Sequence, residues 1–132
     1  MDADARSRAE SMRGLAKRFF DAIEAGDIGT VGAIYADDAV IWHNSDWLSS
    51  TREENIETLR GFIRFVPERS YRDRRVQVST DGFTQQHVLH GVRRDGTPVS
   101  LAACIVCNVE DGRITRLDEY FDTAALAVFL GR

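Results

Sequence analysis

The chain has no long hydrophobic run and no linker, repeat or low-complexity segment. It has 132 residues with 43% apolar composition, which suits one domain with one core and is too short for two ordinary domains. Its longest apolar run, residues 124–130, cannot span a bilayer, and residues 1–10 lack the apolar stretch of a signal peptide. We therefore expect a single domain, residues 1–132, that is soluble, cytoplasmic and not bound to membranes.

An excess of positive charge is also lacking. The formal net charge is -4 at pH 7 and the sequence pI is about 5.3, which disfavours a nucleic-acid-binding surface. Several arginines between Arg64 and Arg75 nevertheless form a local basic run. This run is most simply a solvated helix end and strand face, with an anion site as the alternative.

Cysteine is scarce, and the two that occur, Cys104 and Cys107, have the spacing of a redox or zinc pair. They lie within residues 99–109, a continuous apolar stretch that predicts a strand. Residues three apart in a strand point to opposite faces, so the two sulfurs cannot bridge or bind one ion together. We expect two buried free thiols.

The first 67 residues predict three helices. An apolar stripe from Met12 to Ile23 predicts the first helix, which Gly26 can end. Residues 27–35 predict a short second helix. A capping box that begins at Thr51 predicts a third helix, which Pro67 stops. Residues 1–9 precede these signals, and we expect them to be a flexible N-terminal extension.

The rest of the chain predicts strands. A brief strand at residues 40–44 comes before the third helix, and Asp-Gly turn signals separate the later strands as in antiparallel hairpins. Four long strands are expected at residues 71–80, 83–93, 99–109 and 113–121. Asp122 can cap a last short helix. Helices segregated from antiparallel hairpins predict an α+β fold in which helices cover one face of the sheet.

Three segments stand in a characteristic order and spacing. They are Phe19-Phe20-Asp-Ala-Ile-Glu-Ala-Gly-Asp27, Tyr35-Ala-Asp-Asp-Ala-Val-Ile-Trp-His43 and Glu110-Asp-Gly-Arg-Ile-Thr-Arg-Leu-Asp-Glu-Tyr-Phe-Asp122. They resemble the landmarks of the nuclear-transport-factor-2-like superfamily, which includes ketosteroid isomerases, limonene epoxide hydrolases and SnoaL-like polyketide cyclases. The resemblance covers about residues 10–130. It implies a strongly curved antiparallel sheet that forms a cone, closed by the N-terminal helices, with an apolar pocket inside.

The resemblance to ketosteroid isomerases carries over some positions and not others. The aspartate that moves the proton in those enzymes falls on His43, after the Ala-Asp-Asp-Ala turn of residues 36–39. Their two oxyanion donors fall on Phe19 and Ile105, which cannot donate hydrogen bonds. Losing such donors typically costs several kcal/mol of transition-state stabilisation, so we do not expect steroid isomerisation.

The resemblance to limonene epoxide hydrolases is also partial. Their catalytic aspartate falls on Glu119, but the partner arginine and aspartate fall on His87 and Leu89. That change removes the charged pair that activates water, so epoxide hydrolysis by the same mechanism is not expected. SnoaL-like cyclases use an acid from this last strand, which keeps Asp118 as an alternative catalytic residue.

Both comparisons leave His43, His87 and Glu119 at pocket-facing positions, and we predict that these three are catalytic. Two groups that titrate near pH 7 beside a carboxylate suit general acid–base catalysis. Strand alternation and the resemblance give the expected ligand-binding residues: Phe19, Ile41, Gln85, Leu89, Ile105, Leu117 and Phe121. We therefore predict a cofactor-independent acid–base enzyme, of isomerase, cyclase or lyase type, that acts on a small apolar molecule bearing a carbonyl or hydroxyl group.

Alternatives stay open at this point. His43 can equally be a core histidine bonded to a backbone carbonyl, and the domain can bind small molecules or proteins without catalysis. We expect no metal, because the histidines form no His-x-His or His-x-Asp pair. Asn44 and Asp46 are expected to form a turn rather than line the pocket mouth. A homodimer is expected, because the outer face of a sheet rich in Val and Ile needs covering.

Overall fold

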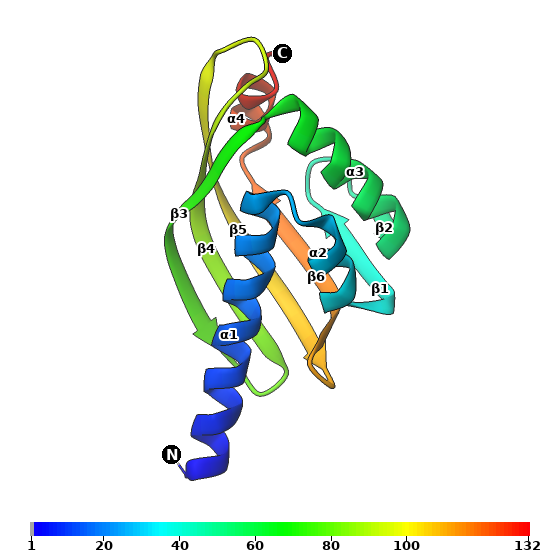
Figure 1. Cartoon of the computed structure of the whole chain (residues 1–132), viewed down its shortest axis with the longest axis vertical. Helices are drawn as coiled ribbons and strands as arrows, with labels where there is room; N and C mark the ends of the chain where they lie inside the picture. Colours follow the sequence, from blue (N-terminus) through cyan, green and yellow to red (C-terminus); the bar gives the residue numbers. More distant parts are fainter. Residues whose placement is uncertain (1) are drawn as a thin grey trace.

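The computed structural model describes residues 2–132, which form helices on one side of a six-stranded sheet (Figure 1). The elements in chain order are α1 (Ala3–Ala25), α2 (Ile28–Ile34), β1 (Tyr35–His43), β2 (Ser49–Thr51), α3 (Arg52–Phe65), β3 (Glu68–Val78), β4 (Gly82–Val92), β5 (Pro98–Glu110), β6 (Arg113–Phe121) and α4 (Thr123–Phe129). The strands are ordered β2-β1-β6-β5-β4-β3 across the sheet. This is the expected α+β architecture.

The helices close one side of a bent sheet. Figure 1 shows α1, α2 and α3 on the same face, with the long strands curving around α1 and with α4 at the end of the molecule near the C-terminus. The arrangement agrees with the cone that the family resemblance implies. Helix α1 begins at Ala3, so residues 3–9 of the expected N-terminal extension form its first turns, while Met1 lies outside the described residues.

The sheet is mixed, whereas the sequence predicts an antiparallel one. β1 runs parallel to β6, with Ile41 opposite Leu117 and His43 opposite Glu119. Turn signals report on strands that are adjacent in the chain, and β1 and β6 are separated by most of the chain, so local patterns could not reveal their relative direction. The short strand β2, antiparallel to β1, was also missed, because three residues carry no readable periodicity.

The helix ends form where the side chains predict them. Gly26 adopts a φ of 74° at the end of α1, a conformation that glycine enters without steric cost. Thr51 and Glu54 form the expected capping box at the start of α3, and the side chain of Asp122 accepts a hydrogen bond at the start of α4.

The interior contains two apolar clusters. The larger lies between α1, α2 and the sheet, and its largest fully buried side chains include Phe19, Phe20, Tyr35 and Phe83. Burying each such side chain stabilises the fold by roughly 1.5–3 kcal/mol. The smaller cluster joins Val66, Leu89, Leu101 and Phe129, so that α4 packs over one end of the sheet.

The two cysteines are free, as the sequence predicts, but they differ in burial. Cys107 is buried in the larger cluster, whereas Cys104 is half-buried because alternation places it on the outer face of β5. The prediction of two buried thiols is therefore wrong for Cys104.

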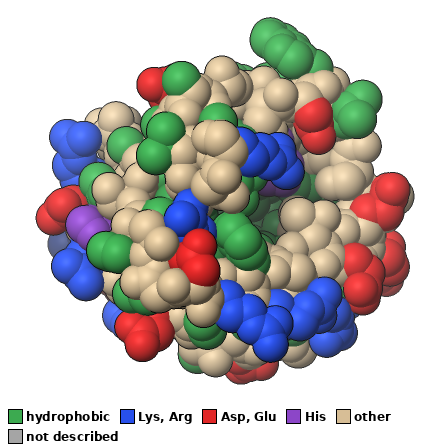
Figure 2. Space-filling model, turned by 90° about the horizontal axis from the view of Figure 1, so that it is seen from above, with side chains coloured by type: hydrophobic (Ala, Val, Ile, Leu, Met, Phe, Trp, Pro, Cys, Tyr) green, Lys and Arg blue, Asp and Glu red, His purple; other side chains and the backbone are tan. Residues whose placement is uncertain are grey.

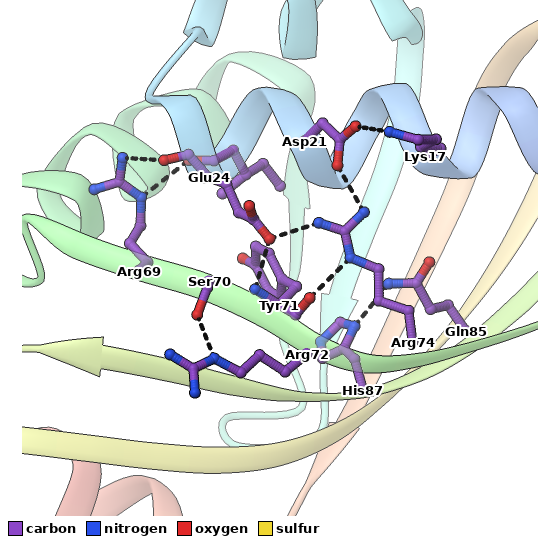
Figure 3. Close-up of polar contacts among 11 residues, drawn as sticks. Lys17, Asp21, Glu24, Arg69, Ser70, Tyr71, Arg72, Arg74, Gln85 and His87 are labelled. Atoms are coloured by element: carbon purple, nitrogen blue, oxygen red, sulfur yellow. Dashed lines mark hydrogen bonds and ion pairs between the residues drawn. The ribbon is translucent and has the colours of Figure 1, made fainter.

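Two arginines of the basic run are structural rather than solvated. The guanidinium of Arg69 donates to the carbonyl oxygens of Ile23 and Glu24 at 2.9 and 2.8 Å, which satisfies the end of α1. Arg74 pairs with Asp21 at 2.7 Å and with Glu24 at 2.6 Å (Figure 3). Together these contacts fasten the end of α1 to β3.

A β-bulge in β3 directs Arg74 toward α1. The register shifts between Arg72 and Arg75, so Asp73 and Arg74 together stand opposite His87 of β4, and Asp73 has a φ of 56°. The sequence carries no glycine or proline signal for this bulge.

Candidate functional site

One row of inward-facing side chains crosses four strands of the sheet. His43 of β1 stands opposite Glu119 of β6, Glu119 opposite Ile105 of β5, and Ile105 opposite Gln85 of β4. Residues directly opposite each other share a face, so all four point toward the helices. The parallel pairing of β1 with β6 is what brings His43 beside Glu119.

His43 and Glu119 form a hydrogen-bonded pair at one end of this row. The Nε2 atom of His43 lies 3.1 Å from Oε1 of Glu119, and the two side chains are 25% and 22% exposed. Burial lowers the pKa of His43, but the hydrogen bond and charge of Glu119, with the charge of Asp46, outweigh it and raise the pKa above its usual value. The raised pKa favours the imidazolium form of His43 beside the carboxylate, and the pair stays reachable from solvent.

Asn44 fastens this end of β1 to β6. Its Nδ2 donates to the carbonyl oxygen of Phe121 at 2.9 Å, and its Oδ1 accepts from the backbone N–H of Phe121 at 3.2 Å. Its own backbone N–H donates to the carbonyl oxygen of Glu119 at 3.0 Å. Asn44 and Asp46 lie in the turn that follows β1, as expected, and Oδ1 of Asp46 accepts from the backbone N–H of Leu48. The side chain of Asn44 in addition extends the parallel pairing, which the sequence does not predict.

His87 lies deeper and is held on several sides. Its side chain contacts the rings of Phe20 and Tyr71 with centroids 5.1 and 4.7 Å away, and its Nδ1 lies 2.9 Å from Nε2 of Gln85 (Figure 3). Burial lowers the pKa of His87 to about 4; the charge of Glu119 opposes this shift and that of Arg74 adds to it. The imidazole is therefore neutral at pH 7.

The neutral state of His87 differs from the expectation that both histidines titrate near pH 7. Residue spacing in β4 places His87 on the inner face, as expected, but spacing alone does not tell how completely α1 covers it. The structure thus separates the two histidines: His43 lies beside Glu119, and His87 lies beside Gln85.

Gln85 and His87 leave two buried polar atoms without a hydrogen-bond partner within residues 2–132. These atoms are Oε1 of Gln85 and Nε2 of His87, on side chains that are 0% and 4% exposed. A buried polar atom left unpaired costs about 1–3 kcal/mol, so such atoms are rare in protein interiors. A bound molecule that pairs with both atoms would remove this cost, so Gln85 and His87 are candidate ligand-binding residues.

The other expected ligand-binding residues fall into three places. Phe19, Ile41, Ile105 and Leu117 belong to the larger apolar cluster. Leu89 belongs to the smaller cluster. Phe121 is half-buried, and its ring centroid lies 6.3 Å from that of His43, which brings these two rings together at the end of the row.

The surface is hollowed at the end of the molecule that carries α4. Figure 2 shows this end, with hydrophobic side chains deep in the hollow and basic side chains and a histidine at its edge. An open groove elsewhere, between the N-terminal half of α1 and the turns that follow β3 and β5, contains none of the expected site residues.

Metal and membrane signals are both lacking in the part of the chain that the structure describes. Within residues 2–132, no group of three or more His, Cys, Asp and Glu side chains could hold a metal ion. Over the same residues, no helix combines the length and apolar character needed to cross a membrane.

The sequence also matches a family described as SnoaL-like domain, over residues 16–117. The chain belongs to the SnoaL-like family. This confirms the resemblance that the three sequence segments indicate. No curated protein matches this SnoaL-like chain at a significant level.

Solved structures share the fold of this SnoaL-like protein. A candidate polyketide cyclase from Xanthomonas campestris superposes with a TM-score of 0.82 at 21% identity, covering 92% of this chain and 97% of that one. IdmH, a candidate polyketide cyclase from Streptomyces antibioticus, gives 0.79 at 19% identity, covering 91% and 98%. A ketosteroid-isomerase-like protein from Catenulispora acidiphila, solved with trimethylamine, gives 0.77 at 14% identity, covering 89% and 92%. At these identities the likeness establishes the fold.

Proposed function

We propose that this SnoaL-like protein is a cofactor-independent acid–base enzyme that acts on a small apolar molecule bearing a carbonyl or hydroxyl group. The observation that carries the proposal is the contact of 3.1 Å between His43 and Glu119 at the accessible end of an apolar interior. The fold likeness to candidate polyketide cyclases supports a polyketide-like or similar substrate.

In this mechanism His43 moves the proton and Glu119 assists it. Neutral His43 removes a proton from a carbon or oxygen of the ligand and becomes an imidazolium, which the carboxylate of Glu119 stabilises through their hydrogen bond. The imidazolium then returns the proton at another atom, so the protein ends each cycle unchanged. Isomerisation, ring closure and elimination all need such a transfer.

Exchange of ligand hydrogens with solvent tests the proposal without knowledge of the natural substrate. The parent protein is incubated in deuterium oxide with small ketones such as tetralone, and NMR follows the loss of protons next to the carbonyl. General acid–base help is typically worth about 100-fold to 10,000-fold in rate, so His43→Gln should slow the catalysed exchange at least about 100-fold. Glu119→Gln should slow it less.

A matched control is His90→Gln. His90 lies on the outer face of β4, opposite Ser100, and away from the interior row. This variant should keep the parent's exchange rate. If His43→Gln exchanged protons as fast as His90→Gln, the acid–base role of His43 would be wrong. Glu119 would then be the next candidate, because Asp118 lies on the outer face of β6, opposite Trp42, and pairs with Arg116.

A non-catalytic binding domain is the second candidate function. The two positions that hold oxyanion donors in ketosteroid isomerases are Phe19 and Ile105, which are 1% and 3% exposed within the apolar cluster. A ligand enclosed by such side chains gains hydrophobic stabilisation without charge stabilisation. Tight binding of a ketone with no catalysed exchange would favour this function.

We further propose that the protein pairs with a second copy through the outer face of the sheet. Trp42 packs its ring against Trp47 and Tyr120 on this face, with centroids 5.4 and 5.3 Å apart, and the latter two are 76% and 45% exposed. Aromatic side chains exposed together are typical of protein interfaces. Light scattering should show a dimer for the parent, and a monomer for Trp47→Ser; a parent monomer at micromolar concentration would contradict the pairing.

A further inference from the structure

The interior holds a second polar pair besides His43 and Glu119. Gln85 and His87 occupy adjacent inward positions of β4, and Figure 3 shows their side chains joined to each other beneath α1. Each keeps one polar atom, Oε1 of Gln85 and Nε2 of His87, that meets no hydrogen-bond partner within the described residues. Both side chains are more than nine-tenths buried, so bulk water does not satisfy these atoms.

The contact between the two side chains determines which of the two unpaired atoms donates a hydrogen bond and which accepts one. The amide Nε2 of Gln85 can only donate, so Nδ1 of His87 accepts this hydrogen bond of 2.9 Å. A neutral imidazole that accepts at Nδ1 carries its proton on Nε2. The pair therefore presents one donor, the Nε2–H of His87, and one acceptor, the Oε1 of Gln85.

The surroundings keep this donor in place. The rings of Phe20 and Tyr71 make edge contacts with the imidazole of His87, which restricts its rotation. Burial keeps the imidazole neutral, because its pKa falls to about 4, so the Nε2–H persists throughout the neutral range. A neutral, fixed donor beside a fixed acceptor suits a hydroxyl group, which accepts one hydrogen bond and donates another.

The pair lies on the same face as His43 and Glu119. Ile105 of β5 stands opposite both Glu119 of β6 and Gln85 of β4, so two strand spacings, about 9–10 Å at the backbone, separate the two polar sites. The side chain between them, Ile105, is apolar and 3% exposed. A molecule about the size of two fused rings has the length and the apolar middle that this spacing requires.

We propose that Gln85 and His87 recognise a hydroxyl group at the far end of a ketone ligand, with His87 Nε2–H donating to the hydroxyl oxygen and Gln85 Oε1 accepting from the hydroxyl O–H. Gln85 is also a positioning residue, because its amide holds His87 in the tautomer that donates. The proposal rests on the proposed function, in which the carbonyl end of the same ligand meets His43 and Glu119.

Nitrogen NMR of histidine-labelled protein tests the tautomer directly. In the parent, His87 should show the Nε2–H form and no titration between about pH 6 and pH 8. In Gln85→Glu the new carboxylate should accept from Nδ1–H, so His87 should change tautomer or become charged. Gln86→Glu is the matched control: it adds the same charge at the exposed neighbouring position on the outer face, and should leave His87 unchanged. A parent His87 with its proton on Nδ1 overturns the assigned roles.

Binding of a matched probe set tests the recognition. The probes are isomeric hydroxytetralones, which carry one carbonyl and one hydroxyl on two fused rings, together with tetralone and tetrahydronaphthol, which each lack one group. The parent should bind at least one hydroxytetralone about tenfold more tightly than either single-group probe, as one well-formed hydrogen bond allows. In Gln85→Leu the preference over tetralone should fall to within about twofold.

Two binding results overturn the recognition: equal affinities for all probes in the parent, or a preference that survives in Gln85→Leu. The binding and exchange experiments can fail independently, so failure of the recognition pair can be told apart from failure of the proposed function. A hydroxyl-dependent preference without catalysed hydrogen exchange supports the recognition pair and contradicts the acid–base role. Catalysed exchange of every probe at equal affinity supports the acid–base role and overturns the recognition pair.

Discussion

Acidification should destabilise this protein through one buried histidine. Burial lowers the pKa of His87 to about 4, from an ordinary value of 6.5. Below pH 6.5 the unfolded chain binds a proton on this histidine that the folded protein does not, so stability is full above pH 6.5 and is lost as the pH falls toward 4. The side chain is 4% exposed, so solvent hardly screens the effect.

The magnitude follows from the size of the shift. A difference of one pKa unit is worth 1.36 kcal/mol, so the full contribution of His87 is about 3 kcal/mol, and about 2 kcal/mol of it is lost between pH 7 and pH 5. This is a large share of the roughly 5–15 kcal/mol that stabilises a typical domain. His43 works in the opposite direction, because its raised pKa stabilises the protein at low pH and this contribution is lost as the pH rises through that pKa.

Urea denaturation at pH 7, 6 and 5 measures the effect when the parent is compared with His87→Leu. The two proteins differ at this one side chain, so the difference between their pH dependences reports the titration of His87 together with its coupling to neighbouring charges. The parent should lose about 2 kcal/mol more than His87→Leu over this range, and His90→Gln should behave as the parent does. Equal pH dependence in the parent and His87→Leu would refute the conclusion that His87 is buried and neutral in the folded protein.

Two further predictions concern stability. Asn44→Ala removes two hydrogen bonds to the backbone of β6 and should lower the free energy of unfolding in urea by about 1–3 kcal/mol; an unchanged midpoint would show that β1 holds its register without them. Gly82→Ala should destabilise the protein by more than about 2 kcal/mol, because a Cβ there would lie 1.8 Å from a backbone oxygen of β5. Gly14→Ala is its control, since Gly14 lies inside α1 with space around it, and a melting scan should show it as stable as the parent or up to about 1 kcal/mol more stable.

The sequence predicts the parts of the fold that depend on near neighbours. The capping box at Thr51, the stop at Gly26 and the cap at Asp122 each involve residues a few positions apart, and each is found in the structure. The direction of β1 relative to β6 depends on contacts between distant segments, so the sheet was predicted as antiparallel throughout. The bulge at Asp73 also depends on distant segments: β4 and α1 stabilise it, and no local turn residue marks it in the sequence.

The candidate site divides in the same way. Alternation along β4 and β6 places Gln85, His87 and Glu119 on the inner face, as expected. The contact between His43 and Glu119 required the parallel register, and the role of Asn44 required a partner 77 positions away. The neutral state of His87 follows from its burial under α1, which strand spacing does not reveal.

The pH dependence of hydrogen exchange tests the acid–base proposal most directly. The exchange rate should rise with pH and level off at the same pKa that NMR finds for the His43 imidazole, because the neutral imidazole is the base. Glu119→Gln removes the charge that raises this pKa, so the rate profile and the NMR titration should move together to lower pH. An exchange rate whose pH profile does not follow the titration of His43 would contradict the account. So would a profile that stays unchanged when Glu119→Gln shifts that titration.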